Sequence, residues 1–123
     1  SITVKILREL TISERASIIF IRGNHSSGKT HLCLAMNNAT NKNSFILNKK
    51  IMPSINIQNI SKYNFLIIDD IDCLLANFSD EESIFTLINE FILMKKIIII
   101  TSTKKVDKII FKIPDLASRL KWD

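Results

Sequence analysis

The stretch that most constrains the fold of this chain runs from residue 23 to residue 30. It consists of Gly23, Asn24, His25, Ser26, Ser27, Gly28, Lys29 and Thr30. It fits G-x-x-x-x-G-K-[ST], the pattern of a phosphate-binding P-loop, which is physically meaningful only between a strand and a helix. An apolar run, residues 18–21, precedes it, and a helical pattern, residues 31–38, follows it. The sequence therefore predicts a strand, a phosphate-binding loop and a helix in this order.

The residue types of this loop match what a bound phosphate chain requires. Gly23 and Gly28 permit the tight turns with positive φ that bring backbone amides close to a phosphate. Those amides and the positive end of the following helix attract the anion. We expect Lys29 to reach the β- and γ-phosphates and Thr30 to offer its hydroxyl to Mg²⁺. His31 completes the predicted nucleotide site, and the flanking elements disfavour a chance match in a glycine loop.

A second motif stands at the end of another apolar run. Residues 65–68, Phe-Leu-Ile-Ile, lead directly into Asp69 and Asp70. A continuous apolar run predicts a strand that is buried on both faces, as in a parallel sheet. Two acids after such a strand match the Walker B pattern. We expect Asp69 to hold Mg²⁺ through water and Asp70 to orient or polarise the attacking water. The alternative is a strand end followed by an Asx turn, and the preceding P-loop favours the catalytic interpretation.

A third polar group follows the apolar run of residues 97–100. Thr101, Ser102 and Thr103 come at the carboxyl end of this predicted strand. Ligands of open α/β sheets lie at that edge, so one of these hydroxyls would hydrogen-bond the γ-phosphate or the attacking water. Plain termination of the strand explains the same three residues equally well.

Hydrophobic periodicity and capping signals predict the other elements. In the first half of the chain they predict a leading helix over residues 3–15 (within 1–15), a short strand over 45–47 and a poorly formed helix around 55–60. In the second half they predict a helix capped by Ser79 and closed by Lys95 and Lys96, and an amphipathic segment over 106–113. One or two helical turns over 115–120 follow Pro114.

Composition limits the class of protein. The chain has 123 residues, of which 46% are hydrophobic and 24% charged, as expected for one domain with an ordinary core. No apolar run approaches the roughly 18 residues needed to span a bilayer, and the charged residues 1–15 do not form a signal peptide. Cys33 and Cys73 lie in apolar surroundings without metal-ligand spacing. We therefore expect two reduced thiols in a cytoplasmic protein that does not contact membrane.

The net charge of +5 comes from scattered lysines. Since no recognition motif accompanies them, we do not expect direct DNA binding by this segment. The chain begins with Ser1 and stops at Asp123 without a capping element, so we expect a truncated piece of a longer protein.

Taken together, the motifs resemble those of the AAA+ ATPases, and within them the DnaA replication-initiator family. Residues 28–32, GKTHL, look like the same letters in initiators and helicase loaders, and residues 67–72, IIDDID, look like the initiator Walker B. Residues 114–122, PDLASRLKW, are similar to the matching stretch of the Hda group, short DnaA homologues that mediate regulatory inactivation of the initiator. The resemblance covers roughly residues 16–123.

The resemblance implies a fold. It is a three-layer αβα P-loop NTPase, an AAA+ core with a parallel sheet in the order 5-1-4-3-2. The strand that ends at Thr101 would lie between the P-loop strand and the Walker B strand. Residues 1–123 would form a single, truncated AAA+ domain without the family's lid. The fifth strand would begin after Trp122, which leaves an exposed apolar edge beside the first strand.

The resemblance also implies a mechanism. Arg119 falls at the arginine-finger position, where it would enter the ATP site of a neighbouring initiator and stabilise the transferring phosphoryl group, an effect worth ~10³–10⁵ in rate. Thr103 falls at the sensor-1 position, where initiators carry Asp. The implied cofactors are ATP or ADP and Mg²⁺. The implied partners are the initiator DnaA and the sliding clamp, with homo- or hetero-oligomers forming through the Arg119 face.

Other functions remain as alternatives. An autonomous AAA+ ATPase, such as a helicase loader or a fragment of an initiator, shares the P-loop and the acid pair, although the stretch 116–122 speaks against a loader. A small P-loop phosphotransferase is disfavoured by the acid pair, and a GTPase by the lack of an Asn-Lys-x-Asp base reader.

Overall fold

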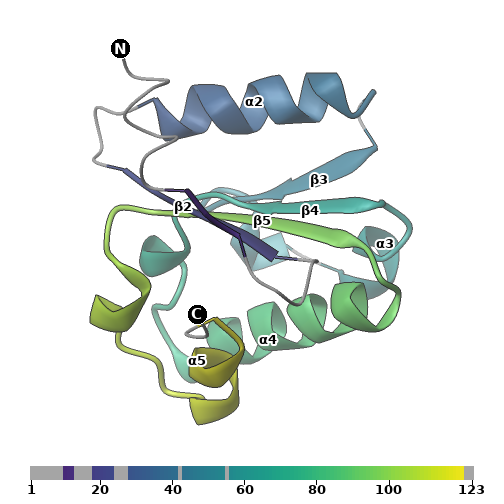
Figure 1. Ribbon diagram of the computed structural model, residues 1–123. Coiled ribbons are helices and arrows are strands. Elements are labelled where there is room, and N and C mark those ends of the chain that lie inside the picture. Colours follow the sequence, from purple (N-terminus) through teal and green to yellow (C-terminus); the bar gives the residue numbers. More distant parts are fainter. Residues whose placement is uncertain (1–9, 13–17, 24–27, 42, 55, 121–123) are drawn as a thin grey trace.

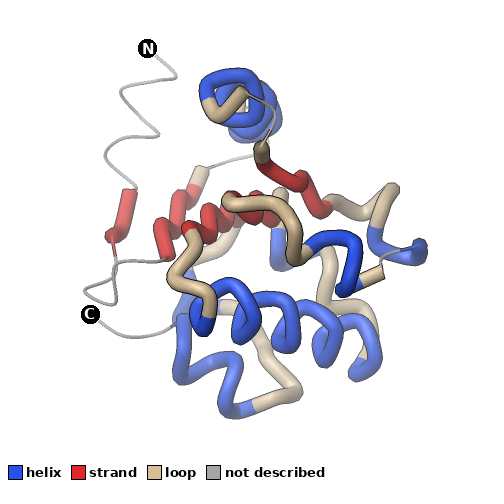
Figure 2. The backbone as a smooth tube through the Cα atoms, turned by 90° about the vertical axis from the view of Figure 1, so that its right-hand side faces the viewer, coloured by secondary structure: helices blue, strands red, loops and turns tan. Residues whose placement is uncertain are grey.

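The computed structural model describes residues 10–12, 18–23, 28–41, 43–54 and 56–120. Helix α2 covers one face of a central sheet, and α4 and α5 lie against the other face (Figures 1 and 2). This is the three-layer αβα architecture that the resemblance implied. The elements are β1 (Leu10–Ile12), β2 (Ile18–Arg22), α2 (Lys29–Ala39), β3 (Ser44–Leu47), α3 (Ile57–Ile60), β4 (Phe65–Ile68), α4 (Phe78–Leu93), β5 (Ile97–Ser102) and α5 (Pro114–Leu120), with short 3-10 helices η2 (Met52–Ser54), η3 (Ile71–Cys73) and η4 (Val106–Lys108).

The sheet has the order β1-β2-β5-β4-β3. Strands β2, β5, β4 and β3 pair in parallel, so that Ile18 lies opposite Ile98 and Phe65 opposite Ile97. The strand that ends at Thr101 and Ser102 therefore separates the P-loop strand from the Walker B strand, as expected. Since all four parallel strands end at the same edge, their carboxyl ends bring the predicted chemical groups together.

The first described element differs from the prediction. Leu10–Ile12 form a strand that pairs antiparallel with β2, with Leu10 opposite Ile21. The predicted leading helix is therefore wrong at these residues, and its other residues, 1–9 and 13–15, lie outside the described part of the chain. The expected open edge beside β2 is also wrong, because β1 occupies it. Pairing satisfies the backbone amides and carbonyls of that edge, and this outweighs the helical periodicity of a short segment.

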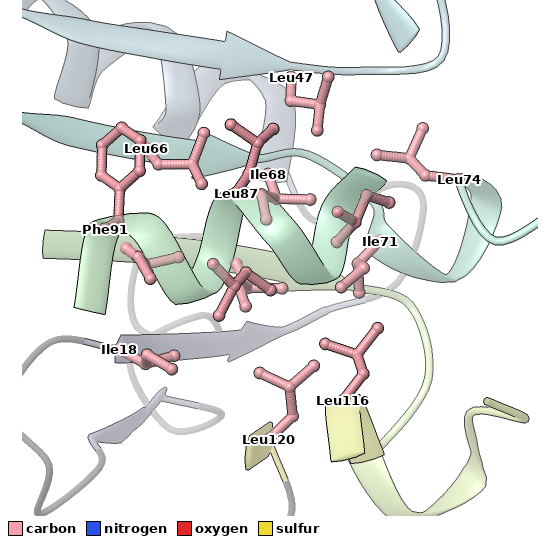
Figure 3. Close-up of a cluster of buried hydrophobic side chains, with 14 of the residues drawn as sticks. Ile18, Leu47, Leu66, Ile68, Ile71, Leu74, Leu87, Phe91, Leu116 and Leu120 are labelled. Carbon is pink, nitrogen blue, oxygen red and sulfur yellow. The ribbon is translucent and has the colours of Figure 1, made fainter. Parts of the chain in front are cut away.

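The core has one part on each face of the sheet. The larger part packs between the sheet and α4, whose Ile84, Leu87, Ile88 and Phe91 are completely buried (Figure 3). The smaller part lies under α2 and consists of Ile21, Cys33, Ile67 and Ile99. Neighbouring residues of one strand thus face opposite layers, which is why the central strands are continuously apolar.

The ends of α4 show one error and one success of the prediction. Asn77, with extended φ of −148°, caps the helix by accepting the Asp80 N–H at 2.8 Å. The predicted cap, Ser79, lies inside the first turn instead. At the other end Lys95 has φ of 56°, and the Lys96 N–H donates to the Phe91 carbonyl at 2.8 Å. This left-handed end confirms the predicted stop.

The segment between β5 and α5, residues 103–113, is mostly irregular. Within the predicted amphipathic segment 106–113, only η4 is helical. The short helix expected after residue 113 is present as α5. No helix in the described ranges is long and apolar enough to cross a membrane.

Leu87 provides a test of the larger core part. Leu87→Ala removes a completely buried side chain from α4 and should lower the free energy of unfolding by about 2–5 kcal/mol. The matched control is Leu93→Ala on the same helix, where the side chain is 77% exposed and the change should stay within about 0.5 kcal/mol. Urea unfolding of both variants measures the difference, and equal losses would contradict the assigned packing.

Candidate functional site

Gly23 and Gly28 stand at the two ends of the predicted phosphate loop. Gly23 is buried, and its N–H donates to the Ser102 carbonyl at 2.9 Å, which ties the end of β2 to β5. Gly28 has φ of 84° and precedes the first turn of α2, a conformation that glycine adopts without strain. Lys29 and Thr30 are the first two residues of α2, and His31 is exposed on the same turn. Asn24, His25, Ser26 and Ser27 lie outside the described residues.

The acid pair is fixed by a threonine of the neighbouring strand. The completely buried Thr101 donates from Oγ1 to Asp69 Oδ1 at 3.0 Å and accepts the Asp70 N–H at 2.9 Å. The Asp69 N–H donates to the Leu47 carbonyl at 2.8 Å, and the Asp69 side chain is only 8% exposed. The structure thus brings Asp69, Asp70 and Thr101 together at the carboxyl edge of the sheet, as the strand order requires.

Asp70 also shapes the backbone at this edge. It has φ of 55° and ψ of 62°, in the left-handed region. Its carbonyl accepts the Cys73 N–H at 2.8 Å, which starts η3. Aspartate tolerates this conformation better than most residues. The turn directs the chain away from the sheet immediately after the acid pair.

Asp72 is a site residue that sequence reasoning missed. Its Oδ1 accepts the Ser102 hydroxyl at 3.2 Å and the Thr103 N–H at 3.3 Å, and its Oδ2 accepts the Thr103 hydroxyl. The polar residues at the end of β5 therefore have different partners: Thr101 bonds the acid pair, whereas Thr103 bonds Asp72. The catalytic role of Thr103 stays a prediction. The signal available in the sequence was a third acid two residues after the pair.

A pocket of about 250 Å³ lies beside the acid pair. Its walls are formed by Asn48, Lys49, Lys50, Asp69, Asp70 and Cys73. Asn48 Oδ1 holds the turn after β3 by accepting the backbone N–H groups of Lys50 at 3.1 Å and Ile51 at 3.0 Å. The exposed lysines offer positive charge to an anion, while the acids offer oxygen ligands to a cation.

The oxygen groups of this edge fit a magnesium ion that a nucleotide shares. Mg²⁺ usually takes one or two carboxylates and completes its shell with phosphate and water. Asp69, held by Thr101, supplies such a carboxylate. Among the described residues, no group of three or more His, Cys, Asp or Glu side chains could hold a metal ion.

Cys33 of α2 lies next to Asp69. Burial is the main cause that raises its pKa to about 12, and the negative charge of Asp69 and a hydrogen bond to it act in the same direction. The thiol is therefore neutral at physiological pH and contributes to packing.

Arg119 belongs to a different surface. It is half-buried on α5, and with Phe85, Asp115 and Ser118 it lines a second pocket of about 230 Å³. This pocket shares no residue with the one beside Asp69 and Asp70. Of the described residues, Arg119 thus lines the pocket on α5 and not the pocket beside the acid pair.

The tether on Thr101 can be tested by removing only its hydroxyl. Thr101→Val keeps the shape of the buried side chain but leaves Asp69 Oδ1 and the Asp70 N–H each without this partner. We expect the free energy of unfolding to fall by about 1–3 kcal/mol. Thr86→Val, at an exposed position of α4, is the control and should change it by at most about 0.5 kcal/mol. A Thr101 variant as stable as its parent would show that the tether does not hold the edge.

The two thiols should differ in reactivity. Cys33 is buried, with a pKa raised to about 12, whereas Cys73 is exposed. Because the thiolate is the reactive form, iodoacetamide at pH 8 should alkylate Cys73 in the folded protein and Cys33 only after unfolding. Peptide mass spectrometry locates the label, and Cys73→Ser is the control that should abolish labelling of the folded chain. Rapid labelling of Cys33 in that variant would contradict the assigned burial.

Comparison of the sequence with known proteins gives one relative. No family model matches the sequence. An uncharacterised protein of Haemophilus influenzae is 29% identical over 128 residues, which cover 94% of this chain and 53% of that protein. The chain thus spans about half the length of this relative.

Several solved structures of DnaA are similar. AMPPCP-bound DnaA from Aquifex aeolicus has a TM-score of 0.70 and 25% identity, over 83% of this chain and 37% of that one. Domain III of DnaA from Thermotoga maritima has a TM-score of 0.69 and 23% identity, over 85% of this chain and 51% of that one. Replication initiator DnaA bound to AMPPCP and single-stranded DNA has a TM-score of 0.72 and 22% identity, over 98% and 42%. The chain therefore has the AAA+ fold of the DnaA domains, and it spans about half of those chains or less.

Proposed function

We propose that this chain is a nucleotide-binding AAA+ regulator of replication initiation, which resembles Hda and stimulates hydrolysis of ATP bound to the initiator DnaA. The observation that carries the nucleotide-binding part is the acid pair tethered by Thr101 at the carboxyl edge, where β5 alone separates its strand from the strand before the predicted P-loop. Two of the DnaA structures of the same fold contain AMPPCP, an ATP analogue, which supports ATP or ADP as the ligand.

The roles within the chain's own site follow from this arrangement. The loop of residues 23–31 would cradle the phosphates, with Lys29 reaching the β- and γ-phosphates. Thr30 and Asp69 would hold Mg²⁺, which neutralises charge on the phosphates when bound. Asp70 would orient or polarise water, and Thr103 would act near the γ-phosphate. The tether on Thr101 supports these roles because it fixes the Asp69 carboxylate before any ligand arrives.

The regulatory part of the proposal concerns Arg119. Leu116 and Leu120 anchor α5 in the core, while Arg119 lines the second pocket. A guanidinium on an anchored helix, away from the chain's own acid pair, is suited to act in the site of a neighbouring molecule. Its fork of N–H donors matches a phosphoryl group. The partners would be the initiator and the sliding clamp, and the Arg119 face would form the contact with the initiator.

The same acid pair also favours a second function. Asp69 and Asp70 are both present and fixed, as an autonomous AAA+ ATPase requires. Such an enzyme, a helicase loader for example, would use Asp70 on its own ATP and would not depend on Arg119 acting elsewhere.

The decisive experiment follows hydrolysis of initiator-bound ATP in the presence of clamp and DNA. Full-length protein should stimulate it, and Arg119→Ala should lower the stimulation by at least ~10³-fold. Arg119→Lys, which keeps the charge but loses the planar fork, should retain only part of it. Absence of stimulation by the parent, together with ATP turnover that Asp70→Asn abolishes, would reject the regulator and leave the autonomous ATPase.

A further inference from the structure

Glu81 of α4 is a completely buried carboxylate. Acidic side chains are rarely fully buried unless they are paired. Here Oε1 accepts the Lys112 N–H at 3.0 Å and Oε2 accepts the Ile113 N–H at 2.6 Å. Both oxygens thus bind neighbouring backbone amides of one segment, which defines position and direction more strictly than a single hydrogen bond.

That segment immediately precedes α5. The Ile113 carbonyl accepts the N–H groups of Leu116 at 3.1 Å and Ala117 at 3.3 Å, so it starts the hydrogen bonding of the helix. Glu81 holds the amide of the same residue. The Lys112 ammonium group adds a contact, since it donates to the Leu75 carbonyl at 3.3 Å. The two residues before α5 are therefore attached both to α4 and to the loop after η3.

The remaining freedom of α5 is small. Leu116 and Leu120, one turn apart, point into the core from the same side of the helix (Figure 3). Phe85 lies one turn after Glu81 on α4 and lines the second pocket together with Arg119. Helix α4 thus holds α5 before its start through Glu81 and borders its far end through Phe85.

We propose that Glu81 is a positioning residue for Arg119, which fixes the start of α5 so that the guanidinium is presented in one direction to ATP bound by a neighbouring AAA+ protomer. This inference rests on the proposed function of Arg119. If the Glu81 carboxylate only stabilised the fold, replacing it would lower the free energy of unfolding but would leave the rate at which the folded protein stimulates hydrolysis unchanged. A positioning carboxylate must affect the rate at which the partner's ATP is hydrolysed, beyond its effect on folding.

Glu81→Gln separates these roles with a small change. The glutamine oxygen can accept one of the two backbone N–H groups, but its NH₂ group faces the other donor and cannot accept it. In the assay of partner-bound ATP, kcat should fall by roughly tenfold up to ~10²-fold, the range expected for a catalytic group displaced by about 1 Å. The protein concentration that gives half-maximal stimulation should stay unchanged, because the contact surface is intact.

Glu82→Gln is the matched control. It makes the same chemical change at the next residue, where the side chain is exposed, and it should leave kcat at the parental value. Circular dichroism and the urea midpoint ensure that only folded protein is compared. If the Gln variant does not fold, Glu81→Asp keeps the charge but shortens the reach by one methylene and should give the same loss in kcat.

The outcomes distinguish the two proposals. If Arg119→Ala abolishes stimulation and folded Glu81 variants stimulate like the parent, the positioning role is rejected and the function of Arg119 stands. The same rejection follows if these variants change only the half-maximal concentration. If Arg119→Ala itself has no effect, the proposed regulatory function fails, and the positioning role fails with it.

Discussion

The hydroxyl of Thr101 is the group on which the candidate site depends most directly. It donates to the carboxylate of Asp69 and accepts the amide of Asp70, so one buried oxygen joins the ends of β5 and β4. At the next position along β5, the Ser102 carbonyl accepts the Gly23 amide and joins the end of β2. Hydrogen bonds of this kind are strong in a low-dielectric interior. The middle strand thus holds the P-loop strand and the acid pair at a constant separation.

The sequence allowed much of the fold to be predicted because its strongest signals are local. Continuous apolar runs identified the central strands, and the resemblance to initiators supplied their order. The strand Leu10–Ile12 was missed because its stability comes from pairing with β2 and not from its own pattern. The start of α4 was misplaced by two residues because Asn77 and Ser79 are both good caps, and only the extended backbone of Asn77 decides between them.

The parts of the candidate site that consist of consecutive residues could be predicted from the sequence. Gly23 and Gly28 occupy the expected ends of the loop, and the acid pair ends β4 as expected. The polar strand end was left open between two explanations. Its contacts with Asp72 join residues about 30 positions apart, and no local pattern reports such pairs. The burial of Glu81 could not be predicted for the same reason. An acidic side chain near the start of a helix is usually exposed to solvent and interacts with the helix dipole.

The left-handed backbone of Asp70 restricts which side chains this position accepts. A glycine would relax the backbone but remove the carboxylate. A glutamate would keep the charge, yet it is a poorer occupant of this region of the Ramachandran plot than aspartate or asparagine. Backbone geometry and chemistry therefore select the same short acid independently. Any lengthening of the side chain at residue 70 would act on the turn into η3 as well as on the water that the carboxylate is proposed to orient.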